Sequence, residues 1–102
     1  MKITIIPADK AVYVDGCSYS GLDLSKCNIP ENVHALQWFG NKGWIEFCPD
    51  ENGEKLDNQT ITELPDWAIS AKLKWDDEKE NTIYLAKYPP TPDSGQIPVI
   101  TL

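Results

Sequence analysis

The chain has 102 residues, of which 41% are hydrophobic and 25% are charged, a composition typical of one globular domain and not of a disordered chain. Its formal net charge is −7, which argues against nucleic-acid phosphates and anionic lipid as direct partners, because both require a basic surface. No apolar run approaches the roughly 20 residues that cross a bilayer, so we expect no membrane partner either.

The first part of the chain predicts three short antiparallel strands joined by tight turns. Residues Lys2–Ile6 are mostly β-branched, and Ala11–Val14 form a second strand-like run. Asp15-Gly16 follows directly, and this dipeptide favours a tight hairpin turn because both positions tolerate positive φ. Cys17–Ser20 is expected to return as a third short strand.

The central stretch, VHALQWFGNKGWIEF, predicts a β-hairpin that is rich in aromatic residues. Its strands, Val33–Phe39 and Trp44–Cys48, are expected to pair with Phe39 opposite Trp44. Alternation then gives a mostly apolar face toward the core, made of His34, Leu36, Trp38, Ile45 and Phe47. The opposite, more polar face carries Ala35, Gln37, Phe39, Trp44, Glu46 and Cys48. A three-residue loop with a bulge would instead shift this register by one and turn one strand over.

After residue 63 the apolar residues recur every three or four positions and no longer every second position, which predicts one amphipathic helix. A turn at Asp50–Gly53 and a strand over Lys55–Thr60 come before it. Pro65 is tolerated only in the first helical turn, with Thr62 or Glu63 at the cap. The apolar stripe consists of Leu64, Trp67, Ala68, Ala71 and Trp75.

Pro89-Pro90 must end this helix after about Tyr88, and residues 89–102 contain four prolines, which predicts an extended arm. The apolar end of the arm can add a strand to an exposed sheet edge, of another copy or of a different protein, or can fold back on its own sheet. Its candidate partner-binding residues are Val99, Ile100 and Leu102. The expected fold is therefore α+β, with one domain over residues 1–88. It comprises an antiparallel, hairpin-built sheet packed by one C-terminal helix, followed by an extended C-terminal arm.

No motif points to catalysis, a metal or a cofactor. Cys17, Cys27 and Cys48 lie ten and twenty-one positions apart, unlike the close cysteine pairs of zinc sites. A cysteine nucleophile needs a base, and His34 falls on the opposite hairpin face from Cys48. The segment Asp50–Gly53 has glycine fourth, whereas a calcium-binding EF-hand loop has it sixth. We therefore expect a protein that is not an enzyme.

The ten aromatic residues are the distinctive feature that remains. Most should build the core, but tryptophan and tyrosine also dominate binding hot spots. Because Phe39 and Trp44 fall on the more polar hairpin face, they are the candidate partner-binding residues of the domain.

Four segments, MKITIIPADKAVYVDG, YSGLDL, VHALQWFGNKGWIEF and ITELPDWA, resemble a group of small bacteriophage and prophage proteins from the tail or tail-fibre region. The resemblance covers roughly residues 1–75 and offers no catalytic residues. It implies a non-enzymatic tail or baseplate accessory protein that docks on a fibre or baseplate component. Such a protein would be found in the virion tail, and in the host cytoplasm during assembly.

Three alternatives remain beside this hypothesis. The first is a tail-fibre assembly chaperone that is absent from the particle. The second is an acidic inhibitor of a host defence complex, which would need its carboxylates gathered into a phosphate-like stripe. The third is an enzyme, for which the residues provide no catalytic constellation. A second copy of the chain is a further candidate partner.

Overall fold

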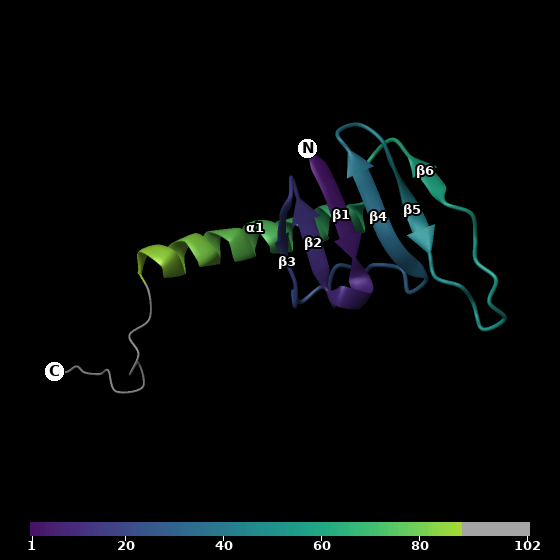
Figure 1. Ribbon diagram of the computed structural model, residues 1–102, viewed down its shortest axis with the longest axis horizontal. Coiled ribbons are helices and arrows are strands. Elements are labelled where there is room, and N and C mark those ends of the chain that lie inside the picture. The colour runs from purple at the N-terminus through teal and green to yellow at the C-terminus, as the bar shows by residue number, and fades with distance from the viewer. Residues whose placement is uncertain (89–102) are drawn as a thin grey trace.

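The computed structural model describes residues 1–88 and contains an antiparallel six-stranded sheet with one helix against it (Figure 1). Its elements are β1 (Lys2–Ile6), the 3₁₀ turn η1 (Pro7–Asp9), β2 (Ala11–Val14), β3 (Cys17–Tyr19), β4 (Val33–Phe39), β5 (Gly43–Phe47), β6 (Gln59–Ile61) and α1 (Asp66–Lys87). The α+β fold, with a hairpin-built antiparallel sheet packed by one C-terminal helix, is therefore confirmed. The expected arm, 89–102, with its candidate residues Val99, Ile100 and Leu102, lies outside the described residues.

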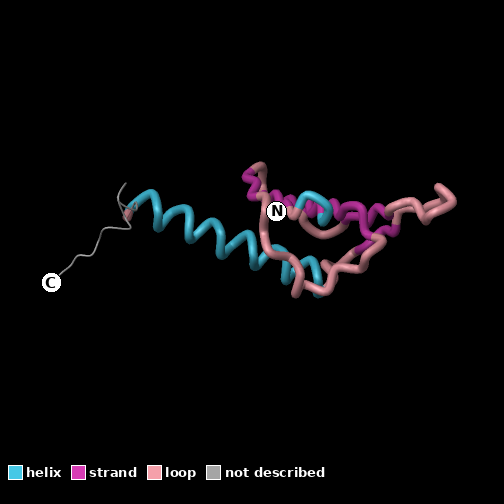
Figure 2. Tube along the Cα trace, turned by 90° about the horizontal axis from the view of Figure 1, so that it is seen from below, coloured by secondary structure: helices cyan, strands magenta, loops and turns pink. Residues whose placement is uncertain are grey.

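The sheet has the strand order β3-β2-β1-β4-β5-β6, so β1 lies between two partners. Ile3 is paired with Val14 of β2 on one side and with Trp38 of β4 on the other. Ile3 and Ile5 are fully buried, whereas the Lys2 side chain points to the other face and is exposed. The sheet consequently has an inner face that α1 covers and an outer face that is open (Figure 2).

Both turns that the sequence predicts from glycine have the expected backbone. In the β2–β3 turn, Asp15 and Gly16 both have positive φ, at 49° and 86°. The Asp15 carboxylate also accepts a hydrogen bond from the backbone N–H of Lys2 at 2.8 Å, which ties the turn to β1. After β5, Gly53 has a φ of 80° and donates its N–H to the Asp50 carbonyl at 3.0 Å.

The β4–β5 hairpin forms as expected, but its register differs by two residues. Trp44 is paired with Gln37 and not with Phe39. The reason is a tighter turn, since the Phe39 N–H donates to the Lys42 carbonyl at 2.8 Å and leaves only Gly40 and Asn41 in the loop. Because side chains alternate with a period of two, a shift of two leaves the faces of this part of the hairpin unchanged.

A β-bulge at the start of β4 corrects the expected position of His34. The register shifts between Val33, which is paired with Phe47, and Ala35, which is paired with Glu46. The extra residue in the bulged strand turns Val33 into the core and His34 out to solvent. The prediction that His34 faces the core is therefore wrong, because the bulge turns its side chain outward.

The strand expected over 55–60 is shorter and begins later, as β6. Only three residues pair, with Ile45 opposite Gln59 and Gly43 opposite Ile61. Residues 55–58 are exposed and form no strand. Their side chains are mostly polar or charged, so they would gain little by packing on the sheet.

The helix α1 begins two or three residues later than the sequence indicates. Pro65 is the N-cap, with an extended backbone at φ −67° and ψ 156°. Its carbonyl accepts the N–H groups of Ala68 at 2.9 Å and Ile69 at 3.1 Å. Thr62 and Glu63 therefore do not cap the helix, because Pro65 itself supplies the first carbonyl of the hydrogen-bond ladder. Within residues 1–88, no helix has the length and apolarity that a membrane crossing requires.

The core lies between the inner sheet face, α1 and the loop after β3. The expected helical stripe is confirmed, since Ala68, Ala71 and Trp75 are buried and Leu64 and Trp67 pack against them. The core cluster also contains Ile3, Ile5, Val12, Val14, Leu22, Leu24, Cys27, Val33, Leu36, Trp38 and Ile45.

Trp75 marks the point where α1 leaves the sheet. Its indole N–H donates to the carbonyl of Cys17 at 2.9 Å, and its ring lies 5.8 Å from that of Tyr19, both on the edge strand β3. No residue of α1 after Trp75 is buried, and the helix continues beyond β3 into solvent (Figure 1). We call residues 79–87 of α1 the overhang.

Candidate binding surface on the outer face of the sheet

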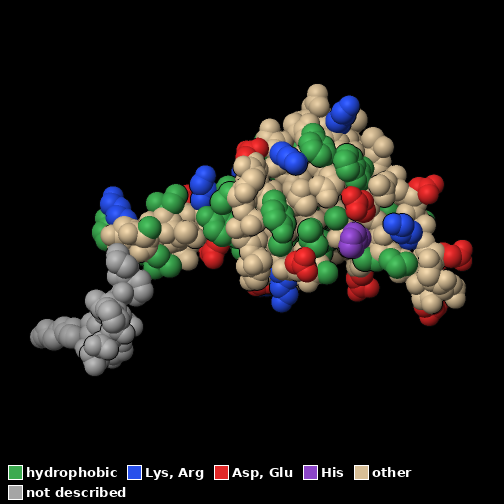
Figure 3. Space-filling model, viewed as in Figure 1, with side chains coloured by type: hydrophobic (Ala, Val, Ile, Leu, Met, Phe, Trp, Pro, Cys, Tyr) green, Lys and Arg blue, Asp and Glu red, His purple; other side chains and the backbone are tan. Residues whose placement is uncertain are grey.

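A continuous row of side chains crosses the outer face of the sheet. Thr4 in β1 is paired with Tyr13 of β2 on one side and with Gln37 of β4 on the other. Gln37 is in turn paired with Trp44 of β5, which is paired with Thr60 of β6. Directly paired residues point to the same face of an antiparallel sheet, so this row spans five strands. Figure 3 shows this face, with hydrophobic side chains gathered over the strands.

An aromatic pair lies at one end of this face. The rings of Phe39 and Trp44 are tilted by 30° to one another, and their centroids are 5.4 Å apart, a separation typical of aromatic pairs. The Trp44 indole N–H donates to the Glu46 carboxylate at 2.8 Å. The Lys2 ammonium lies 5.4 Å from the centroid of the Phe39 ring. Phe39 is nevertheless 41% exposed, so the pair is oriented by its neighbours but not covered by them.

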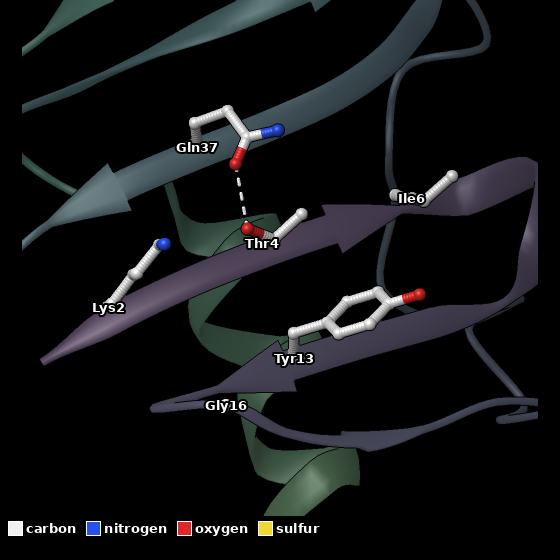
Figure 4. Close-up of a pocket in the computed structure, with 6 residues that line it drawn as sticks. All are labelled: Lys2, Thr4, Ile6, Tyr13, Gly16 and Gln37. Carbon is white, nitrogen blue, oxygen red and sulfur yellow. Dashed lines mark hydrogen bonds between the residues drawn. The ribbon is translucent and has the colours of Figure 1, made fainter.

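A shallow hollow lies beside this pair, above β1, β2 and β4. It measures about 290 Å³ and is lined by Lys2, Thr4, Ile6, Tyr13, Gly16 and Gln37 (Figure 4). The Thr4 hydroxyl donates to the Gln37 side-chain oxygen at 2.7 Å, which fixes the amide, and the amide nitrogen points away from Thr4. The hollow therefore combines a phenol, an ammonium and an amide above a floor of strand backbone.

Two titratable groups away from this face have shifted pKa values. Burial raises the pKa of the Cys27 thiol, which keeps it protonated. The Cys17 side chain is exposed, and that of Cys48 is half-buried. The hydroxyl and backbone N–H of Ser25 hold the pKa of the exposed Asp23 carboxyl below its usual range. Across residues 1–88, no three histidine, cysteine or acidic side chains are grouped so that they could hold a metal ion.

The structure brings two of the predicted site residues, Phe39 and Trp44, into ring contact on the outer face. Their role in binding a partner stays a prediction. The sequence patterns do not indicate the contribution of Thr4, Tyr13 and Gln37. Alternation within β1 and β2 would place Thr4 and Tyr13 opposite the buried residues, but only the strand order joins them to Gln37.

Comparison with protein-family models, with curated proteins and with solved structures finds no match to this chain.

Proposed function

We propose that this chain is a non-enzymatic accessory structural protein of a bacteriophage tail or baseplate, which docks on a fibre or baseplate protein through the outer face of its sheet. The observation that carries the docking proposal is the exposed aromatic pair. The phage context rests on the resemblance of residues 1–75 alone.

The outer face has the chemistry of a protein-binding surface. Aromatic side chains dominate interface hot spots because they bury a large area at a low entropic cost. Phe39 and Trp44 stiffen one another, and the hydrogen bond to Glu46 holds the indole in one orientation. A partner that covers them would therefore lose little conformational freedom from this side.

The polar groups around the pair can define the orientation of the partner. Lys2 and Glu46 offer opposite charges next to the rings, and Gln37 offers an amide in the adjacent hollow. We expect a partner segment with an apolar side chain for the rings and polar groups for the hollow.

Two single variants test the proposal in a phage that encodes this chain. Phe39→Ala and Trp44→Ala should each abolish co-purification with the tail or fibre protein while the isolated variant still folds. Leu56→Ala is the matched control, since Leu56 is 60% exposed and lies in the loop between β5 and β6. Unchanged co-purification of both aromatic variants would refute docking through this face.

Mass spectrometry of purified virions separates the tail component from the assembly chaperone. The proposal requires the chain in the finished particle at a fixed ratio to its partner. A chain that binds the fibre protein during infection but is missing from virions is a chaperone. The acidic side chains visible in Figure 3 are scattered over this face and its edges and form no continuous stripe, which gives the nucleic-acid mimic no specific support.

A further inference from the structure

A groove runs along one flank of α1, between the helix and the end of the sheet where β1 begins. Near the start of the helix it is a hollow of about 260 Å³ whose apolar walls are Met1, Leu64, Ile69 and Leu73. Farther along it becomes a hollow of about 570 Å³ that extends to Ile83 of the overhang. Both hollows share Met1, Lys72 and Asp76, so they form one continuous groove.

The overhang presents apolar side chains that its own domain does not cover. Ile83, Tyr84 and Leu85 are 57%, 58% and 42% exposed. At the other end of the same helix, Ile69 and Leu73 are 46% and 56% exposed. The chain therefore carries two matching elements, an apolar helical segment beyond the sheet and, beside the start of the helix, the apolar end of the groove.

The side chains along this flank have a spacing that is symmetric about Asp76. Lys72 and Glu80 lie four residues before and after it, and Ile69 and Ile83 lie seven residues before and after it. Steps of three and four residues keep all five on one helical face. Reversal of the helix direction therefore superimposes isoleucine on isoleucine and lysine on glutamate.

From this symmetry we infer that two copies of the chain associate through antiparallel pairing of their α1 helices about Asp76. In that arrangement Ile83 of each copy enters the groove of the other, next to Ile69 and Leu73. Lys72 of each copy faces Glu80 of the other. The second copy thus fills the groove and covers Ile83 of the overhang at the same time, and the two contacts are identical, as a two-fold dimer requires.

Charge selects the antiparallel arrangement. A parallel pair in register would set Lys72 against Lys72 and Glu80 against Glu80, which is repulsive at both positions. In the antiparallel pair only the two Asp76 carboxylates meet at the axis. Each of them is already bridged by the Lys72 ammonium of its own helix at 2.8 Å, which reduces the repulsion between the two carboxylates.

The mass of the full chain in solution tests the dimer. Sedimentation should give twice the chain mass of 11.5 kDa, and Ile83→Asp should weaken association by about 100-fold, because the change removes an apolar anchor from both contacts. Leu56→Asp, an equally exposed leucine distant from the groove, should leave the mass unchanged. A wild-type chain that stays monomeric up to about 1 mM would overturn the inference.

A charge exchange tests the orientation without depending on the apolar contact. Lys72→Glu and Glu80→Lys should each weaken association by about tenfold, since each sets like charges against one another. The double variant Lys72→Glu with Glu80→Lys should restore the affinity of the wild type, because the opposite charges again face across the pair. Failure of the double variant to recover, or association that none of the changes affects, would rule out this pairing. The outer sheet face takes no part in this contact, so loss of the dimer and loss of partner docking are separately measurable.

Discussion

Replacement of each hairpin tryptophan by alanine should separate the core from the binding surface. Trp38 is only 6% exposed and is paired with Ile3 in the central strand β1. Its removal leaves a large cavity between the sheet and α1, and such changes cost about 3–5 kcal/mol. A domain of this size has a stability of about 5–15 kcal/mol, so Trp38→Ala should remove about a fifth or more of it. The melting temperature should fall by at least about 12 °C.

Trp44→Ala should cost far less. Its indole is only partly buried, and the change removes the contact with Phe39 and the hydrogen bond to Glu46. An aromatic pair contributes about 0.5–1.5 kcal/mol beyond its buried area, so we expect a loss of about 1–2 kcal/mol. Urea unfolding followed by far-ultraviolet circular dichroism measures both values. Equal losses of stability for the two variants would place both rings in one core and refute the outer face as a free surface.

Three further changes test other parts of the fold. Gly43→Ala should abolish cooperative unfolding, because the new Cβ would overlap the Gln37 carbonyl and lie 2.9 Å from the Cα of Trp38. Both are main-chain atoms of the paired strand β4, and a normal melting curve would contradict this prediction. Trp75→Phe should cost about 1–3 kcal/mol in urea unfolding, since the Cys17 carbonyl loses its donor in a partly buried hydrogen bond, and a neutral result would show that water replaces the indole. Burial raises the pKa of the Cys27 thiol above that of the unfolded chain. The stability that the protonated thiol contributes is therefore fully present below the unfolded pKa, and it is lost as pH rises through the folded pKa. Iodoacetamide at pH 8 should therefore label Cys17 well before Cys27, as read by peptide mass spectrometry.

Local patterns predict the elements of this fold better than their pairing. The alternation in β1 and the helical stripe that ends at Trp75 are each contained in one stretch of sequence, and both are confirmed. The register of the β4–β5 hairpin is harder to predict. The two-residue shift depends on one backbone hydrogen bond around Gly40-Asn41, and no residue pattern marks the bulge beside His34. Both errors concern which backbone groups pair, and residue types constrain that choice only weakly.

The candidate binding surface was predictable only in part. The aromatic pair is predictable from the hairpin, because Phe39 and Trp44 are close in sequence and fall on the same face of its two paired strands. The hollow next to it joins Tyr13 to Gln37 through Thr4 of β1, so it depends on the strand order. The strand order places β1 next to β4, although they are far apart in the sequence, and no local sequence pattern predicts this pairing.

The central position of β1 also bears on how the chain folds as it is synthesised. β1 can pair early with β2, but its other edge must wait until β4 emerges, about thirty residues later. The apolar inner face of this first hairpin stays exposed to solvent for longer still, because α1 is the last described element to be synthesised. A nascent chain of this kind exposes an unpaired strand edge and a hydrophobic surface together, the combination that favours aggregation. Rapid translation through residues 33–75 should therefore raise the yield of native protein, and a pause within that stretch should lower it.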